Sequence, residues 1–140
     1  MTSKDSNPKD AVGITKAPVS TVPGTALHLL GLALMEGAVK YGRHNWRDAG
    51  IRYSVYYDAM MRHMSAWWEG EDIDPDSGLP HPVKAMACLA ILVDAIVLKN
   101  GCDDRPPRLP EGWLVEINER AKALLERYPN PPEPHTELPR

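Results

Sequence analysis

The sequence PVKAMACLAILVDAIVL, at residues 82–98, is the strongest structural signal in this chain. Pro82 suits the first turn of a helix, where its missing N–H costs nothing. Residues 85–93 carry no charged side chain, so a helix there needs apolar cover on all sides. A small domain provides that cover most easily when the helix also packs against a second copy of the chain. We therefore predict that residues 82–98 form the assembly surface of a homodimer or homotetramer.

Three further stretches have the spacing of apolar residues that is typical of helices, namely residues 25–41, 53–68 and 111–128. The first is apolar nearly all round, and the second has a broad apolar face. The third has a single apolar stripe with charged residues outside it. No stretch predicts a convincing strand, so the fold class that we predict is all-α, as a four-helix bundle.

Prolines divide the chain. A first group lies within residues 106–110 and a second within residues 129–139. We predict a helical domain over residues 1–105, and a C-terminal amphipathic helix with a Pro-rich tail over residues 106–140. The tail at residues 129–140 should be extended, because proline breaks helices and the segment has little to bury. Residues 1–10 are expected to be mobile unless a partner holds them.

Length, net charge and cysteine content limit the classes of function that this chain could have. The length of 140 residues suits one hydrophobic core, and a formal net charge of -3 argues against binding duplex nucleic acid. The apolar run at residues 85–98 is too short for a confident membrane span, and the N-terminus does not resemble a signal peptide. Two cysteines make no disulfide framework, so a reducing, cytoplasmic compartment fits.

An acidic segment separates the second and third predicted helices. Its five carboxylates fall within eight residues and are Glu69, Glu71, Asp72, Asp74 and Asp76. Like charges this close repel, and a hard divalent ion such as Mg²⁺ or Mn²⁺ would supply the missing positive charge. A solvated acidic loop is the alternative. The spacing argues against an EF-hand, because the glycine is one place late at Gly78 and Val83 stands where the closing Glu is required.

Two histidines flank the acidic segment. His63 lies on the apolar face of the helix predicted over residues 53–68, where a histidine is more often part of the core than a ligand. An antiparallel hairpin would bring His63 near His81 or Lys84, but the sequence leaves that distance open. His81 and Lys84 are three residues apart and share one helix face.

Charged and aromatic residues gather where the first predicted helix ends. Glu36 and Lys40 are four residues apart on an otherwise apolar helix, so they form either a simple salt bridge or part of a site. Lys40 and, further upstream, Lys16 offer positive charge to a phosphate. Three residues offer stacking planes or hydrogen bonds to a base: Tyr41, Asn45 and Trp46. A plain core or interface role is the alternative for Trp46.

Taken together, these motifs resemble a known family. They are Lys16-Ala-Pro, Lys40-Tyr-Gly with Asn45-Trp46, Arg62-His63, and Gly70-Glu-Asp leading to Asp74, Ser77-Gly and His81. Over residues 7–100 the chain resembles phage dATP/dGTP diphosphohydrolases of the MazZ-like group. This group is related to the all-α MazG nucleoside triphosphate pyrophosphohydrolases. One departure is that the core lacks the ExxE motif of the wider MazG group, and residues 69–72 fit ExxD only at a helix end.

The resemblance implies an obligately oligomeric helical enzyme that uses Mg²⁺ or Mn²⁺. It would cut a deoxynucleoside triphosphate, dGTP and/or dATP, between the α- and β-phosphates. In phages that replace adenine with 2-aminoadenine, such an enzyme turns dGTP into dGMP for the modified-base pathway. If phage-encoded, it would work in the host cytoplasm.

The local clusters supply the residue roles that we expect. The expected metal ligands are Glu36, Glu71, Asp72 and Asp74. The expected catalytic residues are Glu71, His63 and His81. The expected substrate-binding residues are Lys16, Lys40, Tyr41, Asn45, Trp46 and Lys84. The alternative function is a non-enzymatic oligomeric protein that binds a metal or a nucleotide, and a further alternative moves the cut to another phosphate bond.

Overall fold

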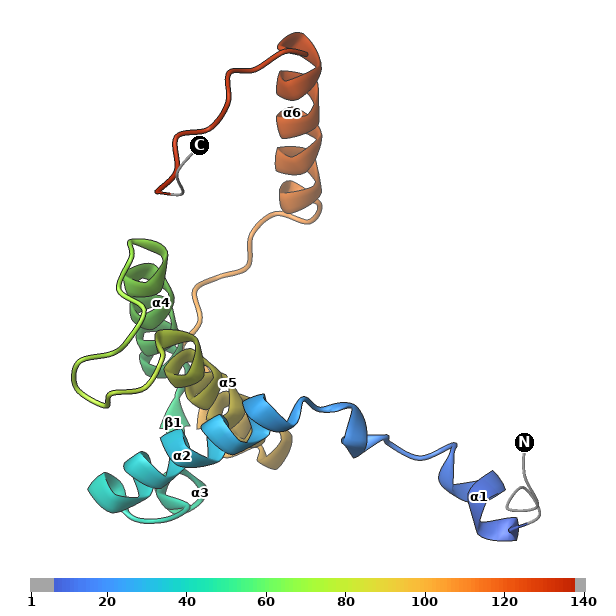
Figure 1. Ribbon diagram of the computed structural model, residues 1–140, viewed down its shortest axis with the longest axis vertical. Helices are drawn as coiled ribbons and strands as arrows, with labels where there is room; N and C mark the ends of the chain where they lie inside the picture. Colours follow the sequence, from blue (N-terminus) through green and yellow to red (C-terminus); the bar gives the residue numbers. More distant parts are fainter. Residues whose placement is uncertain (1–6, 138–140) are drawn as a thin grey trace. The chain divides into compact units, whose positions relative to one another are not determined.

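The computed structural model describes residues 7–137, and it is mostly helical (Figure 1). The chain divides into two compact units, Met1–Arg105 and Pro106–Arg140, which are described separately. The long helices of the first unit are α2 (Gly24–Tyr41), α4 (Tyr53–Trp68) and α5 (His81–Leu98). These confirm the helices predicted over residues 25–41, 53–68 and 82–98, each to within one residue at either end.

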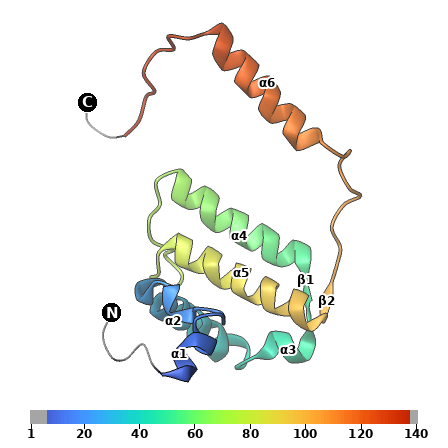
Figure 2. The ribbon, with the colours of Figure 1, turned by 90° about the vertical axis from the view of Figure 1, so that its right-hand side faces the viewer.

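Helix α5 lies between the other two long helices of the first unit. It runs antiparallel to α4, and α2 crosses its other side (Figure 2). The buried core is small and sits where α2 meets α5. It consists of Ala33, Leu79, Val83 and Ala87, with Leu30, Leu34 and Met86 packed against them. Small alanine side chains let the two helices approach closely.

Two strands of two residues each join the ends of the α4–α5 hairpin. Strand β1 (Ile51–Arg52) pairs in parallel with β2 (Gly101–Cys102), so the residue before α4 meets the segment after α5. The prediction that the chain contains no strand is therefore wrong at this point. Strands this short have no alternating pattern that a sequence could show. They pair because the antiparallel helices bring their outer ends together.

A short helix, α3 (Asn45–Ala49), is held against α5 by polar contacts. Asp94 of α5 accepts hydrogen bonds from the indole N–H of Trp46 at 2.7 Å and from the guanidinium of Arg47 at 2.9 and 3.0 Å. The side-chain amide of Asn100 donates to the carbonyl oxygens of Trp46 and Arg47. These bonds attach the α2–α4 connection to the end of α5.

Large apolar side chains remain exposed on α2 and α5. Val39 is 80% exposed, Val97 71% and Val93 59%. The apolar composition of α5 is also the reason why we expect residues 85–93 to need more cover than a single chain provides. The four-helix bundle stays a prediction, because within the first unit α5 contacts two long helices, α2 and α4.

By length and composition alone, α5 is the one helix among residues 7–137 that could cross a membrane, with a mean hydropathy of 1.8. Core helices of soluble proteins pass the same test. Here α5 carries Lys84 and Asp94, and both form ion pairs with other helices of the same unit. These ion pairs attach α5 to α2 and α3.

The N-terminal segment contains α1 (Pro8–Gly13) and a 3-10 turn, η2 (Val19–Thr21). The side chain of Asn7 accepts a hydrogen bond from the backbone N–H of Lys9, which caps α1, and Pro8 occupies the first helical turn. Residues 8–10, expected to be mobile, are therefore helical. The rest of that prediction concerns residues 1–6, which lie outside the described residues.

The second unit holds α6 (Trp113–Arg127), within the range of 111–128 that the sequence predicts. Its apolar stripe is exposed, with Leu114 at 63% and Leu124 at 55%. Residues 129–137 contain no helix, and residues 138–140 of the predicted tail lie outside the described part of the chain.

Candidate functional site

Asp74 is the buried centre of the acidic segment. It is 8% exposed, and its carboxylate accepts hydrogen bonds from the Ser77 hydroxyl at 2.7 Å and from the backbone N–H groups of Asp76 and Ser77. The backbone of Asp74 also bonds to Leu79 and Gly78, so the loop folds back around this residue. Burial raises the pKa of Asp74, but the hydrogen bonds outweigh it and hold the pKa below its ordinary value. Asp74 is therefore a carboxylate at neutral pH.

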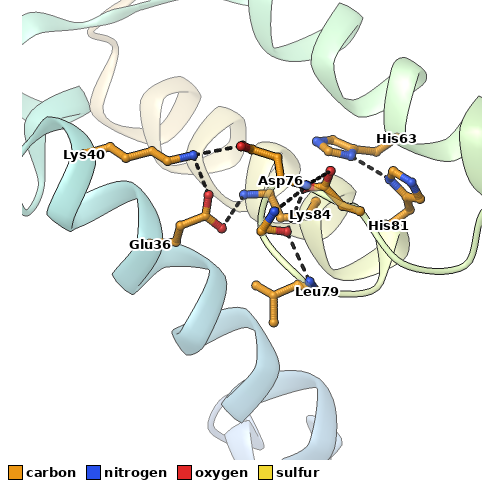
Figure 3. A network of polar contacts seen from close by, with 9 residues as sticks. Glu36, Lys40, His63, Asp76, Leu79, His81 and Lys84 are labelled. Atoms are coloured by element: carbon orange, nitrogen blue, oxygen red, sulfur yellow. Dashed lines mark hydrogen bonds and ion pairs between the residues drawn. The ribbon is translucent and has the colours of Figure 1, made fainter.

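Two histidines lie beside this carboxylate. The Nδ1 atoms of His63 on α4 and His81 at the start of α5 are 2.9 Å apart. Figure 3 marks this contact with a dashed line. One ligand atom from each of His63, Asp74 and His81 lies within 4.8 Å of the other two. Burial lowers the pKa of His63, so its imidazole is neutral at pH 7. We call His63, Asp74 and His81 the His–Asp cluster.

Glu71 contacts the His–Asp cluster from the far side of one ring. Its carboxylate lies 2.7 Å from Nε2 of His81, a nitrogen that is not the one facing His63. The ring of His81 is 4% exposed and thus lies between two polar partners. The backbone N–H of His81 donates to the carbonyl of Asp72, which brings the start of α5 to the acidic loop.

A chain of ion pairs runs next to the cluster (Figure 3). Glu36 of α2 accepts from Lys40 at 2.6 Å and from Lys84 of α5 at 3.0 Å, and Lys40 also donates to Asp76 at 3.1 Å. The hydrogen bond from Lys40 is the main cause that lowers the pKa of Glu36, and the same bond raises the pKa of Lys40. Two ammonium groups and two carboxylates thus join α2, the acidic loop and α5.

Seven residues that the sequence singled out come together here: Glu36, Lys40, His63, Glu71, Asp74, His81 and Lys84. Other expected residues lie apart from these contacts. The side chain of Asp72 is exposed, and Lys16 is exposed between α1 and η2. Tyr41 is 72% exposed at the end of α2. Asn45 begins α3, and Trp46 donates its indole N–H to Asp94.

Two residues that hold these elements in place have no role among those expected from the sequence. Ser77 bonds to Asp74, and Asp94 holds α3. Asp94 had a detectable signal, because it is the single charge in residues 85–98 and an isolated charge on an apolar helix needs a partner. Ser77 is part of the motifs that carry the family resemblance, but nothing in the sequence indicates its hydrogen bond to Asp74.

Cavity size does not identify the site. An open depression of about 430 Å³ lies beside β1 and β2 and is lined by residues 49–52 and 100–102. It contains none of the cluster residues. The chemistry lies instead where α2, α4, α5 and the acidic loop meet, and this place offers two imidazoles, a buried carboxylate and two nearby ammonium groups.

Comparison with known proteins assigns the sequence to a family. A family profile described as dATP/dGTP diphosphohydrolase, N-terminal, matches residues 6–105. A protein of Salmonella phage PMBT28, named dATP/dGTP diphosphohydrolase, is 30% identical over 90 residues. That match covers 64% of this chain and 30% of the phage protein, so the chain spans less than a third of the relative's length. No solved structure matches the chain. The profile covers most of the chain, including α2, α4, α5 and every residue of the His–Asp cluster, and the chain therefore belongs to the family of the dATP/dGTP diphosphohydrolase N-terminal domain.

Proposed function

We propose that this chain is a metal-dependent deoxynucleoside triphosphate pyrophosphohydrolase, which converts dGTP and/or dATP to the monophosphate and pyrophosphate. The name of the phage relative and the family profile support the substrate class. The observation that carries the proposal is the His–Asp cluster beside the paired lysines Lys40 and Lys84. Such a site offers a place for a cation next to a place for phosphate.

The reaction is a substitution at the α-phosphorus. A water oxygen bonds to the α-phosphorus while the bond to the bridging oxygen of the β-phosphate breaks, and pyrophosphate leaves with that electron pair. Glu71, His63 and His81 are the groups that we propose to take the proton from the water, since they contact one another beside Asp74. A divalent ion, Mg²⁺ or Mn²⁺, would supply neutralising charge for the triphosphate and lower the pKa of the attacking water. Glu36, Glu71, Asp72 and Asp74 are the carboxylates proposed to hold it.

Lysines balance the charge of the triphosphate. Lys40 and Lys84 now pair with Glu36, and Lys40 also pairs with Asp76. Phosphate oxygens would replace these carboxylates as partners, which gives the ion-pair chain a function beyond holding α2 to α5. Lys16 is proposed as a third cation. Tyr41 or Trp46 would stack on the base, and Asn45 would help to select it.

A homodimer or homotetramer through α5 belongs to the same proposal. Residues Val93 and Val97 lie four apart on one helix face and are mostly exposed, which an enclosed core helix would not show. A second copy would cover this face. The enzyme would act in the host cytoplasm, in the purine or 2-aminoadenine nucleotide metabolism of a phage, without membrane or duplex nucleic acid as a partner.

The experiment is a panel of all common nucleoside triphosphates, each with Mg²⁺ and with Mn²⁺, in which the products are identified. The proposal expects pyrophosphate and monophosphate from dGTP or dATP. It also expects Lys84→Gln to lower the rate at least about tenfold, while the matched variant Lys122→Gln on α6 keeps it. Inorganic phosphate as the product would place the cut at another bond. Binding of metal or nucleotide without any hydrolysis would favour the non-enzymatic alternative.

A further inference from the structure

Two imidazoles and one carboxylate from three different elements come together at the His–Asp cluster. His63 comes from α4, Asp74 from the acidic loop and His81 from the first turn of α5. Asp74 and His81 are 8% and 4% exposed, so both are held by the fold and not by chance contact at the surface. A buried carboxylate beside two imidazoles is a donor set for a cation, and it contains more nitrogen than the carboxylate set proposed above.

Glu71 has a different position from the three ligands. Its carboxylate contacts Nε2 of His81, which then carries the proton, and this leaves Nδ1 of His81 as the nitrogen with a free electron pair. Nδ1 is also the atom that faces His63. Carboxylates commonly hold metal-binding histidines in this way through the other ring nitrogen. The contact makes Glu71 a positioning residue for His81.

The separation of the two nitrogens is short enough for both to contact one ion. Nδ1 of His63 and Nδ1 of His81 lie 2.9 Å apart, and a ligand atom of Asp74 lies within 4.8 Å of both side chains' ligand atoms. Without an ion, the same separation suits an N–H···N hydrogen bond. The metal-free protein therefore already holds the two rings close enough to bind one ion together.

We propose that Nδ1 of His63, Nδ1 of His81 and one carboxylate oxygen of Asp74 form a three-ligand site for a divalent first-row transition ion, in preference to Mg²⁺. Two imidazoles and one carboxylate suit such ions, whereas Mg²⁺ prefers oxygen ligands. Glu71 positions His81, and Glu36 remains the partner of the lysines. This inference deepens the metal dependence of the proposed function and revises the ligands assigned there.

The test measures metal binding to the nucleotide-free protein, so that it does not depend on hydrolysis. In equilibrium titrations, Co²⁺ and Mn²⁺ are expected to bind at least about tenfold more tightly than Mg²⁺. His63→Gln and Asp74→Asn should each weaken Co²⁺ binding by roughly a hundredfold or more, and Glu71→Gln by about 10- to 100-fold. His28→Gln, at an exposed position on α2, is the matched control and should keep the affinity. Glu36→Gln separates the two ligand sets, because it should keep the affinity here and lose it if Glu36 binds the ion.

A second measurement avoids variants that fail to fold. In the unmodified protein, substoichiometric Mn²⁺ should broaden the imidazole NMR signals of His63 and His81 and leave those of His28 and His44 sharp. The inference is overturned if the signals of His63 and His81 stay sharp, if Mg²⁺ binds as tightly as Co²⁺, or if no ion binds. If the ion binds here and no triphosphate is hydrolysed, the proposed function fails and the inference stands.

Discussion

Single side chains hold the acidic loop in its functional shape, and Ser77 is the clearest case. Its hydroxyl donates to the buried carboxylate of Asp74 and accepts the backbone N–H of Leu79. A hydrogen bond to a charged group contributes about 1.5–3 kcal/mol. Ser77→Ala should therefore lower the free energy of unfolding by roughly 1.5 kcal/mol, measured by urea denaturation. The control Ser65→Ala, at an exposed position on α4, should change it by less than about 0.5 kcal/mol.

Asp94 shows how one charge responds to pH. The hydrogen bond from Arg47, followed by that from Trp46, lowers the pKa of Asp94 from its ordinary value of 3.8. A carboxyl group whose pKa is lower in the folded state stabilises the protein above its ordinary pKa, and that contribution disappears as the pH falls through the folded value. Asp94→Asn should therefore lower Tm near pH 7 by an amount that shrinks below about pH 4.

The measurement is the difference in Tm between the two proteins from about pH 7 to about pH 3. Asp58→Asn, at an exposed position on α4, is the control and should show a small difference at every pH. A Tm difference for Asp94→Asn that stays constant down to about pH 3 would mean that the carboxylate charge of Asp94 does not matter for stability.

At the scale of elements, helix ends depend on residues far along the chain. Asp104, after β2, accepts hydrogen bonds from the backbone N–H and the hydroxyl of Ser54 in the first turn of α4. It satisfies an N-terminal N–H group that α4 cannot satisfy by itself. The α4–α5 hairpin is thus joined at its open end by a cap as well as by the β1–β2 pair.

Gly101 allows the close approach on which this junction depends. A Cβ atom at this position would overlap the ring of Tyr53, the first residue of α4. Gly101→Ala should destabilise the protein by about 1–3 kcal/mol, because the ring or the β1–β2 pair must move. Gly31→Ala in α2, where a Cβ meets no atom within 4 Å, should be neutral or stabilising by up to about 1 kcal/mol. Thermal unfolding of the two variants tests this prediction. An equal loss of stability in Gly101→Ala and Gly31→Ala would contradict the steric argument.

For the whole molecule, the exposed face of α5 should decide the oligomeric state. In an interface, two glutamates on this face would lose apolar contacts and bury unpaired charges. The double variant Val93→Glu, Val97→Glu should therefore be monomeric in size-exclusion chromatography with light scattering, whereas we expect the natural sequence to be a dimer or tetramer. Leu114→Glu on α6, with a similarly exposed side chain, is the control and should keep the natural mass. An unchanged mass for the double variant would place the assembly surface elsewhere.

The division of the chain into two units leads to a further prediction for the whole molecule. We propose that residues 1–105 fold as a domain without residues 106–140, because the α2, α4 and α5 contacts all lie within the first unit. A chain that ends at Arg105 should keep the Tm of the full chain within a few degrees and bind Co²⁺ with unchanged affinity. A molten fragment, with helical circular dichroism but no cooperative thermal transition, would show that the second unit is needed.

The sequence by itself determined the helices of residues 25–41, 53–68, 82–98 and 111–128, because the periodicity of apolar residues and the placement of proline are local properties. It also placed the acidic loop between two of them. Only the tertiary structure decided that, of the five carboxylates, Asp74 is buried beside both histidines while Glu71 contacts the outer nitrogen of His81. It likewise paired Glu36 with Lys84, 48 residues further along the chain. Such distances follow from how helices cross and how a loop folds back, and these depend on packing between segments that no local pattern records.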